Sequence, residues 1–136
     1  MSKTKIINFL VALKHEALPI IDYFELTLND KKYRNIFSNV EKNIFLIITG
    51  IGIQNAKKAV AKLKQLNNNK NDIWVNIGIA GHEIFKVGSI YEIKKVISSN
   101  NKNTFFTNSF YNKIPTSTIY CVNKEEKKYK NKYLYD

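Results

Sequence analysis

The sequence predicts an α/β protein with a mixed, largely parallel central sheet that is flanked by helices. Three apolar runs of strand length occupy residues 6–13, 44–49 and 73–79. Between the second and third runs, apolar residues recur at helical spacing, as on one face of an amphipathic helix. Strand, helix and strand in succession form a βαβ unit, and such units build parallel sheets with right-handed crossovers.

The first apolar run, residues 6–13, is interpreted as a buried strand. Asn8 interrupts the run, charged residues follow it at once from Lys14, and no small-residue cleavage site of a secretion signal is present. The run is also far shorter than the roughly 20 residues that a membrane-spanning helix needs. We therefore expect neither a leader peptide nor a membrane anchor in these 136 residues.

Residues 14–17 are expected to form a polar turn after this strand, and a short helix should follow with Pro19 in its first turn. Two short strands are expected at residues 25–28 and 33–38, because apolar and aromatic residues flank a turn signal at residues 29–30.

The central βαβ unit gives the sharpest pattern. After the strand at 44–49 comes a tight loop at residues 50–52, then a helix at about 54–66, a polar linker and the strand at 73–79. The residues on the apolar face of this helix are Ala56, Ala59, Val60 and Leu63.

The last third of the chain has weaker signals. A further strand is expected at residues 89–97, while residues 98–118 are rich in Ser, Asn and Thr and residues 124–132 are strongly charged. Residues 133–136 resemble the start of another strand. A length of 136 residues suits one hydrophobic core, so we expect a single domain spanning residues 1–136.

The formal net charge of +11 raises the possibility of nucleic-acid binding. However, lysines are spread evenly along the chain, and Arg34 is the single arginine, whereas recognition surfaces concentrate charge and use arginine for bidentate contacts. The abundance of Lys, Asn and Ile is typical of drift in base composition. We therefore expect no nucleic-acid partner and interpret the lysines as a solvated surface.

Histidine and cysteine residues give little support to a metal or cofactor site. Cys121 is the single cysteine, which excludes an internal disulfide and is typical of a reducing, cytoplasmic location. His15 and His82 lack a nearby carboxylate cluster of the kind that holds a metal. We expect no metal and no cofactor.

Three features follow predicted strands, where open α/β sheets bind their ligands. They are Glu16, the loop Gly50-Ile51-Gly52 and the segment from Gly78 to His82. Each also has a simpler explanation, as an exposed turn carboxylate or as tight turns that need glycine. The first glycine loop half matches a dinucleotide-binding fingerprint, with Asp72 about 20 residues downstream, although Asn55 breaks that pattern.

Four blocks in fixed order resemble the nucleoside phosphorylase superfamily, most closely its methylthioadenosine/S-adenosylhomocysteine nucleosidases. They are VALKHEA at 11–17, TGIGIQNAKKAV at 49–60, WVNIGIAGH at 74–82 and KVGSIYEIKKV at 86–96. The blocks are similar to the family's first strand with its acidic turn, its Gly-Ile-Gly loop and Ala-rich helix, its Asn-x-Gly-x-Ala-Gly loop and its Lys-Val-Gly-Asp segment.

The resemblance implies cleavage of a purine nucleoside at its N-glycosidic bond, within methylthioadenosine salvage. Glu16 would then activate the attacking water. Ile51 would line the 5′ tail of the nucleoside, and Ala80 with Gly81 would bring backbone against ribose and base. The full set of residues implied to bind substrate is Gly50, Ile51, Gly52, Ile79, Ala80, Gly81 and His82.

Two departures from the family pattern refine this expectation. Ile79 stands where relatives often carry Ser or Thr, and the arginines that grip phosphate in phosphorylases have no evident counterpart. Water is therefore favoured as the nucleophile; a phosphate-dependent phosphorylase and a non-catalytic nucleoside-binding remnant stay open as alternatives.

The family's ribose-clamping Met-Glu pair and purine-protonating Asp would both follow the segment that residues 133–136 resemble. We accordingly interpret the chain as C-terminally truncated and expect little or no nucleosidase activity from these 136 residues alone. An unpaired sheet edge should favour self-association, and a homo-oligomer is possible.

Overall fold

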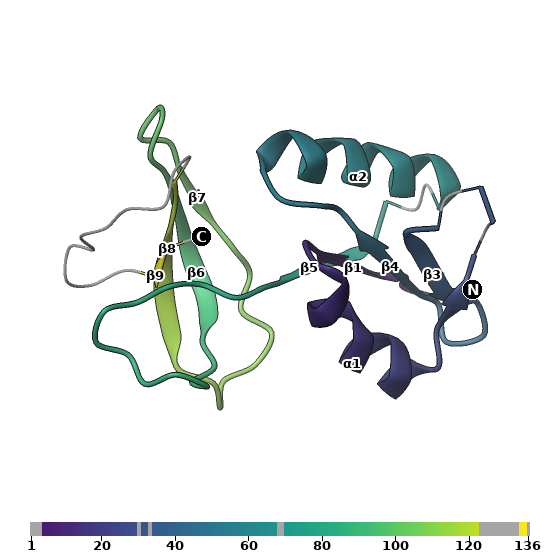
Figure 1. The fold of residues 1–136 in the computed structure, drawn as a ribbon, viewed down its shortest axis with the longest axis horizontal. Helices are drawn as coiled ribbons and strands as arrows, with labels where there is room; N and C mark the ends of the chain where they lie inside the picture. The colour runs from purple at the N-terminus through teal and green to yellow at the C-terminus, as the bar shows by residue number, and fades with distance from the viewer. Residues whose placement is uncertain (1–3, 30, 33, 68–69, 123–133, 136) are drawn as a thin grey trace. The chain divides into compact units, whose positions relative to one another are not determined.

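The computed structural model describes residues 4–29, 31–32, 34–67, 70–122 and 134–135. The chain falls into two compact units, Met1–Gly78 and Ile79–Asp136, and each is described by itself (Figure 1). The organisation of the whole chain as a single domain stays a prediction.

The first unit is a five-stranded mixed sheet with two helices. Strand order is β2-β3-β4-β1-β5; β1 runs parallel to both β4 and β5, while β2, β3 and β4 pair antiparallel. The elements are β1 (Ile7–Val11), α1 (Lys14–Phe24), β2 (Thr27–Leu28), β3 (Ile36–Asn39), β4 (Ile44–Ile48), α2 (Ile53–Leu66) and β5 (Ile73–Ile77). The predicted α/β class with a mixed, largely parallel sheet is confirmed.

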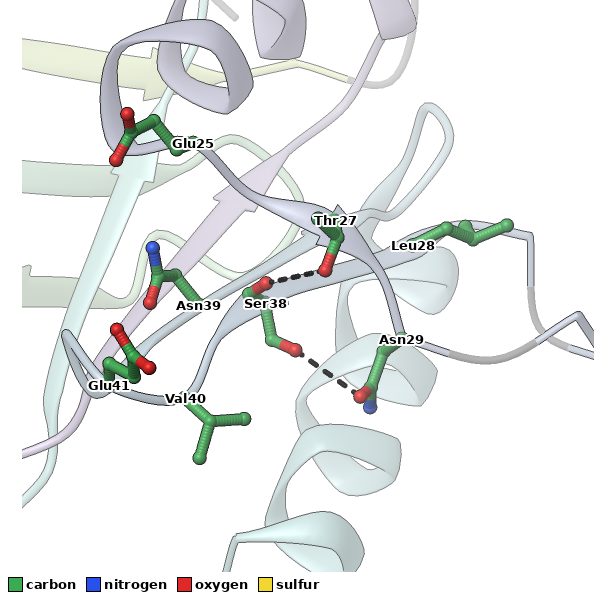
Figure 2. A pocket seen from close by; sticks show the side chains of 8 residues that line it. All are labelled: Glu25, Thr27, Leu28, Asn29, Ser38, Asn39, Val40 and Glu41. Atoms are coloured by element: carbon green, nitrogen blue, oxygen red, sulfur yellow. Dashed lines mark hydrogen bonds between the residues drawn. The ribbon is translucent and has the colours of Figure 1, made fainter.

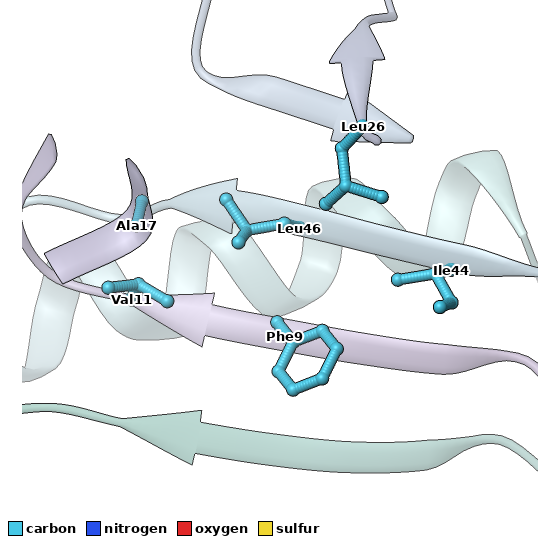
Figure 3. Packing of buried hydrophobic residues seen from close by; sticks show 6 residues of the cluster. All are labelled: Phe9, Val11, Ala17, Leu26, Ile44 and Leu46. Carbon is cyan, nitrogen blue, oxygen red and sulfur yellow. The ribbon is translucent and has the colours of Figure 1, made fainter. Parts of the chain in front are cut away.

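Helices cover both faces of this sheet, with α1 on one side and α2 on the other (Figure 1). Because alternate residues of a strand point to opposite faces, β1 and β4 must be apolar on both, which explains their unbroken hydrophobic runs. The buried cluster on the α1 face is Phe9, Val11, Ala17, Leu26, Ile44 and Leu46 (Figure 3). The cluster on the α2 face is Leu10, Ile36, Ile47, Ala59 and Leu63.

Asn8, which interrupts the first apolar run, is fully buried in the sheet. Its amide donates to Asp72 Oδ2 at 3.3 Å, and its Oδ1 accepts from Asn67 Nδ2 at 2.8 Å. A buried amide needs such partners because an unpaired polar group in the core is costly. The side chain therefore links β1 to the end of α2 and to the residue before β5.

The structure corrects the expected start of the first helix. Residues 14–17 are not a turn but the first turn of α1, so Pro19 lies one turn inside the helix instead of at its start. The Glu16 carboxylate explains this: Oε2 accepts the Leu13 N–H at 3.0 Å, which satisfies a backbone donor at the helix start. Pro19 consequently removes one internal helical hydrogen bond.

The second unit is a four-stranded sheet in the order β7-β6-β8-β9. Its strands are β6 (Glu92–Ser98), β7 (Thr104–Phe106), β8 (Thr116–Cys121) and β9 (Leu134–Tyr135). The strand predicted at 89–97 is therefore present as β6, whereas β7 and the first half of β8 lie in the segment that gave few signals. The charged segment 124–132 lies outside the described residues.

None of the described helices is long and apolar enough to cross a membrane.

Leu63 and Leu66 on α2 offer a matched test of the core. Leu63 is 0% exposed and Leu66 is 49% exposed. We expect Leu63→Ala to lower the free energy of unfolding by about 2–5 kcal/mol, because it leaves a cavity between α2 and the sheet. Leu66→Ala should change it by less than about 0.5 kcal/mol. Urea denaturation measures both, and equal losses would contradict the packing of α2.

Glu92 at the start of β6 gives a pH prediction. Its carboxylate accepts from the Phe110 N–H at 2.8 Å and the Ser109 hydroxyl at 2.9 Å, and these bonds, with that of Phe110 foremost, lower the pKa of Glu92. A lowered carboxyl pKa stabilises the fold above the unfolded-state value, and the effect is lost as the pH falls through the folded-state value. We expect the Phe110 amide NMR signal to shift with that acid titration and to lose its titration in Glu92→Gln.

Candidate functional site

The carboxyl ends of three parallel strands meet at one edge of the first sheet. The register pairs Val11 of β1 with Ile48 of β4 on one side and with Ile77 of β5 on the other. The residues that follow these three strands therefore lie at the same edge. This is the place where open α/β sheets bind ligands.

Glu16, the predicted catalytic residue, lies at this edge in the first turn of α1 and is half-buried. One carboxylate oxygen, Oε2, is held by the Leu13 N–H. The other, Oε1, lies toward Gly78 at the end of β5: a Cβ built on Gly78 would be 3.9 Å from it. The side chain is thus fixed by its own helix and directed toward the end of a neighbouring strand.

The loop Gly50-Ile51-Gly52 lies at the same edge, because the Thr49 N–H donates to Val11 O at 2.8 Å and the Gly50 N–H to Ala12 O at 3.1 Å. Gly50 and Gly52 have φ angles of 81° and 99°, in the region that favours glycine. Ile51 between them is 73% exposed. The structure thus brings Glu16 and this loop to one edge.

Asn55 supports the loop in a way that the sequence did not indicate. Its Nδ2 donates to Ile51 O at 2.8 Å, and the same amide fills the space beside Gly50, where an added Cβ would be 3.3 Å from Nδ2. In the sequence, Asn55 is merely the residue that breaks the dinucleotide pattern. Its position in the first turn of α2, where a short amide reaches back to a loop carbonyl, is the signal that could have revealed its role.

Asp72 argues against the dinucleotide alternative. It precedes β5 and accepts from Asn8 near the start of β1. This is the amino end of the parallel strands, opposite to Gly50-Ile51-Gly52. A ribose-binding acidic residue belongs at the same edge as the glycine loop, so Asp72 does not complete that fingerprint.

The remaining predicted residues, Ile79 to His82, begin the second unit. Ile79 is 78% exposed, Gly81 is exposed, and Ala80 and His82 are half-buried. His82 has the most defined environment of the four. Its Nδ1 accepts the backbone N–H groups of Ile84 at 2.9 Å and Phe85 at 3.0 Å.

These bonds define the chemistry open to His82. A ring nitrogen that accepts hydrogen bonds carries no proton, so the imidazole is the neutral tautomer with its proton on Nε2. In this state His82 can donate one hydrogen bond through Nε2–H. It is not poised to deliver a proton as an acid.

No group of three or more His, Cys, Asp or Glu side chains among the described residues is placed to hold a metal ion. A shallow hollow of about 450 Å³ lies elsewhere in the first unit, against β2 and β3 and near the amino end of β4 (Figure 2). Glu25 at its rim pairs with Lys42 at 2.6 Å, which lowers the pKa of Glu25. The hollow contains none of the predicted site residues.

Solved structures with the same fold are MTA nucleosidases (MTAN). A variant of CT263 (MTAN) from Chlamydia trachomatis bound to MTA matches with a TM-score of 0.74 at 17% identity, over 98% of this chain and 69% of that chain. The chain has a nucleoside phosphorylase-like fold. Selenomethionine CT263 matches with a TM-score of 0.75 at 17% identity. A second structure of the variant matches with a TM-score of 0.73 at 18% identity, and both matches cover the same shares of the two chains.

No protein-family model matches the sequence. No curated protein matches it either. The likeness to MTAN is therefore one of fold, and it confirms the architecture that the four sequence blocks predicted.

The two loop glycines give a prediction for this nucleoside phosphorylase-like fold. We expect Gly50→Ala and Gly52→Ala each to destabilise the protein by about 1–2 kcal/mol, since both φ angles are unfavourable for a residue with a Cβ. Gly78→Ala is the control: its φ is not in that region, and its new Cβ would make only an ordinary contact with Glu16. Thermal denaturation measures all three, and an equal loss in Gly78→Ala would contradict the strain argument.

Proposed function

We propose that this chain carries the water-activating part of a purine nucleosidase that cleaves N-glycosidic bonds in methylthioadenosine salvage. The observation that carries the proposal is the position of Glu16 at the carboxyl edge of three parallel strands, with Oε1 toward Gly78, in a fold shared with MTAN. The loop Gly50-Ile51-Gly52 lies at the same edge. MTA bound to one of those structures supports a small purine nucleoside as the ligand.

In the proposed reaction, water attacks the anomeric carbon of the ribose as the bond to the purine breaks, through an oxocarbenium-like transition state. Glu16 accepts the proton that the water loses, and the purine leaves with a proton from an acid. The bond between Oε2 and the Leu13 N–H orients the carboxylate, and leaves Oε1 directed toward Gly78. Positioning of this kind lowers the entropic barrier to attack.

The remaining predicted residues take binding roles in this proposal. Gly50 and Gly52 allow backbone to approach a ligand closely, and exposed Ile51 offers an apolar contact for the 5′ substituent. Ile79, Ala80, Gly81 and His82 form the second binding segment. His82 contributes a hydrogen-bond donor, Nε2–H, but delivers no proton to the substrate. We therefore assign none of these residues to protonation of the purine.

We therefore expect the 136-residue chain by itself to bind MTA and to release adenine at or near the background rate. Isothermal titration calorimetry measures binding, and chromatographic detection of adenine measures release. Release in the range of ordinary enzymes, about 1–10³ per second, would overturn the expected inactivity. Adenine release that needs added phosphate would favour a phosphorylase. Binding of MTA without adenine release in any longer form of the protein would favour a nucleoside-binding remnant.

Glu16 provides a sharper test, because its structural and chemical roles can be separated. Glu16→Gln retains an oxygen that can accept the Leu13 N–H but cannot act as a base. Glu16→Ala removes both, and should cost about 1 kcal/mol in the free energy of unfolding, which Glu16→Gln should largely spare. In any form that releases adenine, both variants should lower the rate by about 10²–10⁴.

If Glu16→Gln kept its rate, Glu16 would be a helix-capping residue only. If the folded wild-type chain neither bound nor cleaved MTA, the proposed nucleoside site itself would be contradicted.

A further inference from the structure

We propose that His82 is a positioning residue, whose neutral imidazole holds the turn that follows Ala80 and Gly81 and releases this turn when the ring is protonated. The inference deepens the proposed function, because this turn continues the proposed binding segment. The state of the turn itself depends on no ligand and can be measured without one.

The first observation is the pair of hydrogen bonds at Nδ1. Ile84 and Phe85 both donate their backbone N–H groups to this one atom, at 2.9 and 3.0 Å. The donors lie two and three residues after His82, so the side chain closes the turn as an Asn or Asp side chain does in an Asx-turn. The ring nitrogen therefore replaces a backbone carbonyl as the acceptor of this turn.

The second observation is an aromatic stack that fixes the plane of the ring. The His82 and Phe85 rings are nearly parallel, at 6°, with centroids 3.6 Å apart. Phe85 in turn stacks on Tyr91 with centroids 4.7 Å apart and an angle of 19°. Tyr91 directly precedes β6, so the stack connects the turn to the second sheet. An imidazole held in this plane keeps its Nδ1 lone pair directed at the two donors.

Protonation removes the acceptor. An imidazolium carries a proton on each nitrogen, so Nδ1 would then donate and would face two other donors. Phe85, the ring stacked on His82, is uncharged, and no ion pair between His82 and a carboxylate is present among the described residues to offset the change. Glu83 and Lys86, the nearest charges in sequence, are both exposed.

Among ordinary side chains, imidazole is the one whose charge changes between about pH 5 and pH 8. The bonds at Nδ1 exist only with the neutral ring, so the turn is held when the ring is neutral and released when it is protonated.

Hydrogen exchange of the Ile84 and Phe85 amides, measured by NMR on the ¹⁵N-labelled 136-residue chain and corrected for intrinsic exchange, reports on the turn directly. We expect their protection to fall on the order of tenfold between about pH 8 and pH 5, as the two bonds are lost. The imidazole ¹⁵N signals of His82 report the protonation state of the ring in the same samples.

Three variants separate positioning from mere packing. His82→Asn supplies an oxygen that can accept the same two N–H groups and does not titrate, so protection should persist at both ends of the range. His82→Phe keeps an aromatic ring against Phe85 without an acceptor, so protection should be low throughout. His15→Asn removes the other histidine, which is exposed on α1, and should behave as the wild type.

Protection that is independent of pH in the wild type, or equal in His82→Asn and His82→Phe, would overturn the proposal. MTA titrations keep the two proposals distinguishable. If the turn depends on pH but the chain does not bind MTA, the proposed nucleoside site is contradicted and the proposed role of His82 in the turn stands. MTA binding that is unchanged in His82→Phe would show that the turn does not position the ligand-binding segment.

Discussion

The first unit depends on the burial of β1 on both faces and along both edges. β1 is paired in parallel with β4 and with β5, and it lies between α1 and α2. Parallel strands of this kind must be apolar on both faces and covered by helices on both sides. The same arrangement places the ends of three strands in register, so that the strand core and the edge with Glu16 are two consequences of one constraint.

Hydrogen-bonded polar side chains mark the two ends of these strands, and of these Asn8 is fully buried. At the amino end, the amide of Asn8 connects Asn67 and Asp72, and so joins the end of α2 to β1 and β5. At the carboxyl end, Glu16 accepts from Leu13, and Asn55 donates to Ile51. Asn8 thus fixes the spacing of α2, β1 and β5, while Glu16 and Asn55 hold the loops on which the proposed chemistry relies. A residue at a strand end can serve both structure and chemistry, as Glu16 does in the proposed function.

The second unit is built differently. Residues 79–122 of this unit are all half-buried or exposed. Its fixed points are local: the carboxylate of Glu92 holds the segment at Phe110, and the stack of His82, Phe85 and Tyr91 holds the turn before β6. Side-chain contacts therefore carry more of the order in this unit than a hydrophobic core does.

Solved MTAN structures extend beyond the matched region, since the match covers 69% of their chain.

The sequence by itself determined the α/β class, the three parallel strands and α2, because continuous apolar runs and helical spacing reflect burial directly. It also pointed to Glu16 and to Gly50-Ile51-Gly52 as neighbours at strand ends. Only the tertiary structure decided the rest. Helix α1 begins at Lys14 because of a hydrogen bond made by Glu16, and β8, with its mixed polar sequence, becomes a strand by pairing with β6. The roles of Asn55 and His82 rest on contacts with backbone groups. The place of Asn55 early in α2 is a signal for its role, whereas the contacts of His82 follow from the folded turn alone.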